Sequence, residues 1–90
     1  MFKFNEAMSL VVNVDTQDEI DYYWERLTEG GEESQCGWLK DKYGLSWQVS
    51  PRILSEMLLD PDKAKTERVT KAFLQMKKFN IEELKKAFNG

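Results

Sequence analysis

The stretch CGWLKDKYGLSWQVSP, residues 36–51, decides the fold. Its polar centre ends in Gly44, and hairpins place glycine where the backbone takes a positive φ. Beyond the glycine, apolar and polar residues alternate: Leu45, Ser46, Trp47, Gln48, Val49 and Ser50. We therefore predict two short strands joined by a tight turn, with Cys36 at the start of the first strand. The second strand has one apolar and one polar face.

The residues before this hairpin predict a strand followed by a helix. Apolar residues alternate through segment 8–14, which is the pattern of a strand. Thr16 and Glu19 have the spacing of a capping box, which satisfies the first amides of a helix. The helix has an apolar stripe of Ile20, Tyr23, Trp24 and Leu27. Glycines 30–31 end the helix, and segment 32–35 suits either a short strand or a loop.

From residue 51 onward the pattern becomes helical. Ser50 and Pro51 predict an N-cap and a first helical position, and Asp60 with the proline after it predicts a second start. The last helix is expected to open at Asn80. Since ninety residues allow one small core, we expect residues 1–50 and the helical extension 51–90 to form a single domain.

The composition excludes several classes of function. The net charge is −3, and 13 basic residues are interleaved with 16 acidic ones, whereas nucleic-acid binding favours a clustered basic face. No segment approaches the ~18 apolar residues of a membrane span, and the N-terminus lacks a signal-peptide pattern. The single cysteine, Cys36, cannot form an internal disulfide. We therefore expect a cytoplasmic protein that binds neither nucleic acid nor membranes.

Catalytic patterns are scarce. The chain has no histidine, which removes the commonest general base and metal ligand. Cys36, on a strand beside tryptophan, is expected to be a small buried hydrophobe and not a nucleophile. Tyr22, Tyr23 and Trp24 are expected to be core and not a ligand platform. We name no catalytic residue and expect no cofactor.

Two blocks resemble a known family. They are FNEAMSLVVNVDTQDEIDYYWERLTEGG, residues 4–31, and the hairpin block. Both resemble PhnB-type proteins, labelled 3-demethylubiquinone 3-methyltransferase-like, of the glyoxalase/bleomycin-resistance (vicinal oxygen chelate) superfamily. The resemblance implies an α+β fold with a βαβββ module, the order predicted above, and the tail beginning PRILSEMLLDPD is similar too. The methyltransferase label is a family name, and nothing in these residues supports methyl transfer.

The resemblance also implies a partner. Superfamily members place two such modules around one cleft, whereas this chain supplies one. A single curved sheet leaves apolar surface and strand edges exposed. A symmetric homodimer would restore the cup with two modules, and a separately encoded first half is the alternative.

The expected metal site is missing its ligands. In metal-dependent superfamily members, a histidine on the first strand and a glutamate on the last strand bind the metal. Alignment strand by strand puts Ser9 and Gln48 at these positions. A hydroxyl and an amide are weak ligands, so the resemblance implies a fold and a cleft without a metal site.

The polar face of that cleft would hold the ligand-binding residues Ser9, Asn13, Trp38, Ser46 and Gln48, with Ser50 beside them. Hydroxyls and amides orient a small polar molecule but abstract protons poorly. The hydrated side of an incomplete sheet explains the same residues equally well. The expected function is a non-metal small-molecule binding module at a homodimer cleft. The alternatives are a metal-dependent enzyme of the glyoxalase or dioxygenase type, and an interaction subunit that completes another chain's barrel.

Overall fold

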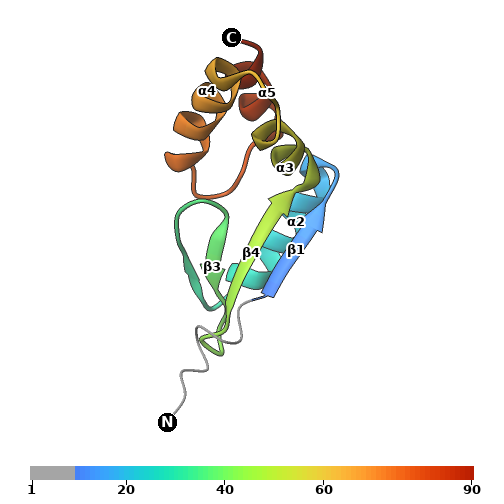
Figure 1. Ribbon diagram of the computed structural model, residues 1–90. Coiled ribbons are helices and arrows are strands. Elements are labelled where there is room, and N and C mark those ends of the chain that lie inside the picture. The colour runs from blue at the N-terminus through green and yellow to red at the C-terminus, as the bar shows by residue number, and fades with distance from the viewer. Residues whose placement is uncertain (1–9) are drawn as a thin grey trace.

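The computed structural model describes residues 10–90 (Figure 1). Within this range the elements are β1 (Leu10–Val14), α2 (Gln17–Thr28), β2 (Glu32–Glu33), β3 (Trp38–Lys40), β4 (Ser46–Pro51), α3 (Arg52–Leu58), α4 (Lys63–Leu74) and α5 (Ile81–Asn89). The order βαβββ followed by three helices confirms the α+β fold with a helical tail. The predicted start of the first strand, at residues 8–9, lies outside the described residues.

The four strands form one sheet in the order β1-β4-β3-β2. Strand β1 runs parallel to β4, and β3 pairs antiparallel with both β4 and β2. Parallel neighbours need a long connection, and here α2 together with the two hairpins supplies it. Strand β4 therefore has a partner on each side, and β1 stands at an edge of the sheet that residues 10–90 form.

Asp41 holds the turn between β3 and β4. Its Oδ1 accepts hydrogen bonds from the backbone amides of Tyr43 (2.9 Å) and Leu45 (3.0 Å), and its Oδ2 accepts one from Trp47 Nε1 at 2.9 Å. The Trp47 indole, followed by these amides, lowers the pKa of Asp41. Gly44 has a φ of 83°, so the predicted turn is confirmed.

Cys36 lies in a turn, and its prediction as a strand residue is wrong. Cys36 and Gly37 have φ values of 58° and 79°, and the Trp38 amide donates to the Gln35 carbonyl at 3.1 Å across them. Two consecutive positive φ values are typical of a type I′ hairpin turn. Segment 32–35 therefore starts with the short strand β2, and the Cys36 side chain is partly buried against the core.

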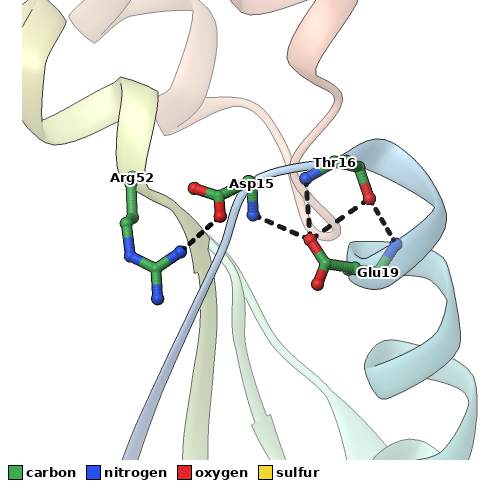
Figure 2. A network of polar contacts seen from close by, with 4 residues as sticks. All are labelled: Asp15, Thr16, Glu19 and Arg52. Atoms are coloured by element: carbon green, nitrogen blue, oxygen red, sulfur yellow. Dashed lines mark hydrogen bonds and ion pairs between the residues drawn. The ribbon is translucent and has the colours of Figure 1, made fainter.

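The capping box of α2 is confirmed and sits beside an ion pair (Figure 2). Thr16 Oγ1 accepts from the Glu19 amide at 3.2 Å, and Glu19 Oε1 accepts from the Asp15 and Thr16 amides at 3.0 Å each. These backbone bonds lower the pKa of Glu19. Arg52 Nη1 lies 2.7 Å from Asp15 Oδ2. The start of α2 is thereby held against the point where β4 becomes α3.

Helix α2 covers one face of the sheet, and only part of its predicted stripe is buried. Ile20 and Trp24 are buried, and Leu27 packs partly against the core. Tyr22 and Tyr23 are 54% and 38% exposed, so their prediction as core residues is wrong. Residues four positions apart share a helix face. Ile20 and Trp24 therefore point to the sheet, and the two intervening tyrosines point away.

The three C-terminal helices begin close to the predicted positions. Strand β4 continues through Pro51, which is the N-cap of α3 without a side-chain bond, so the predicted cap at Ser50 is wrong. Helix α4 is capped by Asp62, whose Oδ1 accepts from two amides of the first turn at 3.0 and 3.3 Å, so the predicted start at Asp60 is wrong by two residues. Asp60 supports this cap by accepting from the Asp62 amide. The predicted cap of the last helix, Asn80, is confirmed.

The linker between α4 and α5 is bound to the first half of the chain. Gln17 Nε2 donates to the Phe79 carbonyl at 3.1 Å, and Gln17 Oε1 accepts from the Ile81 amide at 2.8 Å. Lys78 Nζ lies 2.8 Å from Asp21 Oδ1 and lowers the pKa of that carboxyl. Phe79 is buried in the same core as the α2 and sheet residues. The tail is therefore bound at the start of α2.

Candidate functional site: the open face of the sheet

Strand β4 has two unlike faces, and the strand register shows which residues join each. Side chains of directly paired residues point to the same side of a sheet. Val11 and Trp38 both pair with Gln48, Asn13 pairs with Ser50, and Lys40 pairs with Ser46. On strands β1, β3 and β4, the side opposite α2 therefore carries Val11, Asn13, Trp38, Lys40, Ser46, Gln48 and Ser50. We call this set the open face.

The open face brings together the predicted ligand-binding residues that the structure describes. Asn13, Trp38, Ser46 and Gln48 all lie on it, from three different strands. Ser9 lies outside the described residues. The register of the strands puts these residues on one face of the sheet, and their role in binding stays a prediction.

No helix is drawn across the open face in Figure 1. Helix α2 lies behind β1 and β4, and α3, α4 and α5 gather beyond the end of β4. Val11 is 53% exposed and Asn13 is exposed, while Trp38, Ser46 and Gln48 are half-buried. On the other face Leu39 and Val49 are 1% and 0% exposed. Helix α2 thus buries one side of the sheet and leaves the other side accessible.

The side chain of Gln48, in the middle of this face, is held by a hydrogen bond. Its Nε2 donates a hydrogen bond to the Cys36 carbonyl at 3.0 Å. That carbonyl belongs to the turn before β3, and the turn is itself bound, because the Cys36 and Gly37 amides donate to the Met76 and Lys77 carbonyls at 2.7 Å each. The side chain of Gln48 is therefore held by backbone that the tail helps to fix.

Two members of the open face, Val11 and Lys40, are absent from the predicted ligand-binding residues. Val11 lies between Ser9 and Asn13 in the alternating segment, so the alternation could have found it. Lys40 begins the polar centre of the hairpin block, from which the turn is predicted, whereas β3 continues through Lys40 and pairs it with Ser46. Which residues pair across neighbouring strands cannot be read from a single sequence, so the place of Lys40 beside Ser46 could not be predicted.

The middle of the open face is uncharged. The only charged member of the open face is Lys40, at the end of β3. The other members are neutral: Val11, Asn13, Trp38, Ser46, Gln48 and Ser50. Across residues 10–90, no three side chains of the types His, Cys, Asp and Glu come together to hold a metal ion. The arrangement can offer stacking and hydrogen bonds to a ligand.

Four shallow grooves lined by described residues lie elsewhere. They run between α2 and α5, between α3 and α5, between α4 and α5, and beside the β3–β4 turn. The first has a volume of about 490 Å³ and contains Asp15, Asn80 and Lys85. None of the four is lined by a residue of the open face.

Comparison with known proteins identifies the family. Residues 1–50 match the family model described as 3-demethylubiquinone-9 3-methyltransferase. The chain belongs to this family. The PhnB-like resemblance of the hairpin and helix blocks is thereby confirmed.

One similar solved structure is described as "Putative 3-demethylubiquinone-9 3-methyltransferase, PhnB protein, from Bacillus cereus". The identity is 38% over 56% of this chain and 46% of that chain, with a TM-score of 0.49. The match thus spans less than half the length of that protein. A search of the curated proteins finds no match.

A membrane-crossing role finds no support in the helices. Among those formed by residues 10–90, none has the length and apolar character that crossing a bilayer requires.

Proposed function

We propose that the open face is one wall of a small-molecule binding site and that a second copy of the chain supplies the opposite wall. One observation carries the proposal: Asn13, Trp38 and Gln48 come from three strands to one face that α2 leaves accessible. An aromatic side chain with a few convergent amides and hydroxyls is a usual composition for a ligand site.

The edge of the sheet supports a second copy as the partner. Strand β1 pairs only with β4 among the described strands, and its Leu10 and Val11 are 43% and 53% exposed. An exposed apolar edge strand tends to pair with another chain. Two-fold dimers are the commonest homo-oligomers, and a pairing along β1 would set two open faces next to each other.

The chemistry of the face supports binding more than acid–base catalysis. The chain contains no histidine, and the amides and hydroxyls of the open face do not ionise near neutral pH. Asn13, Gln48 and Ser46 can orient a ligand through hydrogen bonds, and Trp38 can cover an apolar ring. We therefore expect these residues to orient a bound ligand and to bury part of its surface.

The assembly can be tested by sedimentation velocity over a range of protein concentrations. We expect a dimer, and we expect the substitution Val11→Lys to dissociate it, because a lysine on the β1 edge introduces charge into the contact. The matched control is Leu74→Lys on α4, since Leu74 is 56% exposed and Val11 is 53% exposed. The control variant should sediment like the unmodified chain.

Several outcomes would overturn the proposal. A monomer at every concentration removes the second copy and turns attention to a separately encoded first half. Equal dissociation by both lysine variants would place the contact away from β1. A dimer whose melting temperature rises on adding Zn²⁺ or Mn²⁺, and whose rise is lost in Gln48→Ala, would favour the metal-dependent enzyme instead.

A further inference from the structure

Gln48 has a fixed orientation, and this has a consequence for ligand choice. Resting on the proposed function, we infer that Gln48 makes the site selective for flat, uncharged ligands that donate a hydrogen bond through an N–H or O–H group. Gln48 Oε1 is the acceptor for that donor. Trp38 and Val11 flank the ligand on either side of Gln48.

The direction of the Gln48 amide follows from its partner. Nε2 donates to the Cys36 carbonyl at 3.0 Å. A carbonyl oxygen can only accept, so turning the amide over would set two oxygens against each other. The Cys36 carbonyl is positioned by a turn that two 2.7 Å backbone bonds tie to residues 76–77. Gln48 is thus preorganised before any ligand arrives, which reduces the entropy that binding must overcome.

The other end of the amide is an acceptor. Within residues 10–90, no hydrogen bond is made to Gln48 Oε1, and the residue is half-buried in the middle of β4. A ligand that covers this oxygen without donating to it removes the oxygen from water and leaves it unpaired. That loss is unfavourable by about 1–3 kcal/mol, so a ligand with a suitable donor is preferred over one that lacks it.

The neighbours of Gln48 define the shape and charge of the ligand. Val11 and Trp38 pair with it from β1 and β3, so an apolar group stands on each side of the acceptor. Such a strip suits a planar ring, which can stack on the indole. Lys40 pairs with Ser46 and is the diagonal neighbour of Gln48, whose direct partners are both uncharged. An anionic group placed at Oε1 would meet another acceptor, which is unfavourable.

The matched probes indole and 1-methylindole test this inference. They share a ring, and only indole has an N–H donor. Titrations followed by ¹⁵N–¹H NMR of the Trp38 indole and the Gln48 side-chain amide should show indole binding about tenfold more tightly than 1-methylindole. In Gln48→Met the two probes should bind equally. The control Gln35→Met, at an exposed turn position, should keep the preference.

The outcomes separate this inference from the proposed function. Equal affinity of the two probes for the unmodified chain, with shifts at Trp38 and Gln48, overturns the selectivity and leaves the binding face standing. Shifts that map away from the open face, or no binding of either probe at about millimolar concentration, overturn both. Persistence of the preference in Gln48→Met would assign the acceptor to another group and overturn the inference alone.

Discussion

In strands β3 and β4, consecutive side chains point to opposite faces of the sheet, one buried and one open. Leu39 and Val49 face α2 and are 1% and 0% exposed. Their neighbours in the chain point to the open face, where Lys40 is exposed and Gln48 is half-buried. The same backbone thus contributes to a core on one side and to an accessible wall on the other. The comparison teaches that the core is built on one face, so that residues of the other face, where we propose binding, can change with little effect on stability.

The largest expected effect comes from the buried side of this comparison. Leu39→Ala should lower the free energy of unfolding by about 2–5 kcal/mol, because it removes buried methyl groups and leaves a cavity. Its neighbour on the open face, Lys40→Ala, should change that free energy by less than about 0.5 kcal/mol. Urea unfolding followed by tryptophan fluorescence measures both. Similar losses in the two variants would show that the faces do not differ energetically.

A middle-sized effect tests whether the tail unfolds with the sheet. We propose that residues 1–50 and 51–90 form one folding unit, linked by Gln17. Gln17→Ala removes its two bonds to the α4–α5 linker and should lower the free energy of unfolding by about 1–2 kcal/mol. Hydrogen exchange at the Ile81 amide should become faster.

The control for this prediction lies on the same helix. Glu25→Ala replaces an exposed side chain and should leave the unfolding curve within about 0.5 kcal/mol. Two separate unfolding transitions in the unmodified chain, one for the sheet and one for α4 and α5, would refute the single unit.

The smallest expected effect is a pH dependence of stability that arises from Asp41, in the turn between β3 and β4. The folded pKa of Asp41 is lowered, mainly by the Trp47 indole. Its contribution to stability is therefore present above the unfolded pKa and is lost as pH falls through the lower folded value, which is below roughly pH 4. The Trp47 indole N–H resonance should shift in this range.

The neutral variant Asp41→Asn serves as the comparison for that titration. It lacks the titrating carboxyl, so the low-pH shift of the Trp47 indole resonance should disappear. A shift in the unmodified chain centred above about pH 5 would contradict the lowered pKa, and an identical titration in the variant would assign it to another carboxyl.

Local patterns predicted much of the fold. The capping box at Thr16, the turn glycine Gly44 and the cap at Asn80 are all confirmed, because each depends on residues within a few positions of one another. The errors arose where a distant contact competes with a local preference. Cys36 was placed on a strand, but its turn is held by bonds to residues 76–77.

The candidate site was predicted in part. Alternation along β4 identified the polar face with Ser46 and Gln48. It did not show which residues of β1 and β3 stand beside Gln48, since a register depends on pairing between strands and not on either strand alone.

By itself, the sequence determined the order of strands and helices, the two-faced character of β4 and the resemblance to the PhnB-like family, because alternation, caps and turns are local. Only the tertiary structure decided that β1 pairs parallel with β4, that Gln17 bonds residues 62 and 64 positions away, and that Gln48 is held by the Cys36 carbonyl. These are contacts between distant segments, whose geometry is set by packing the whole core.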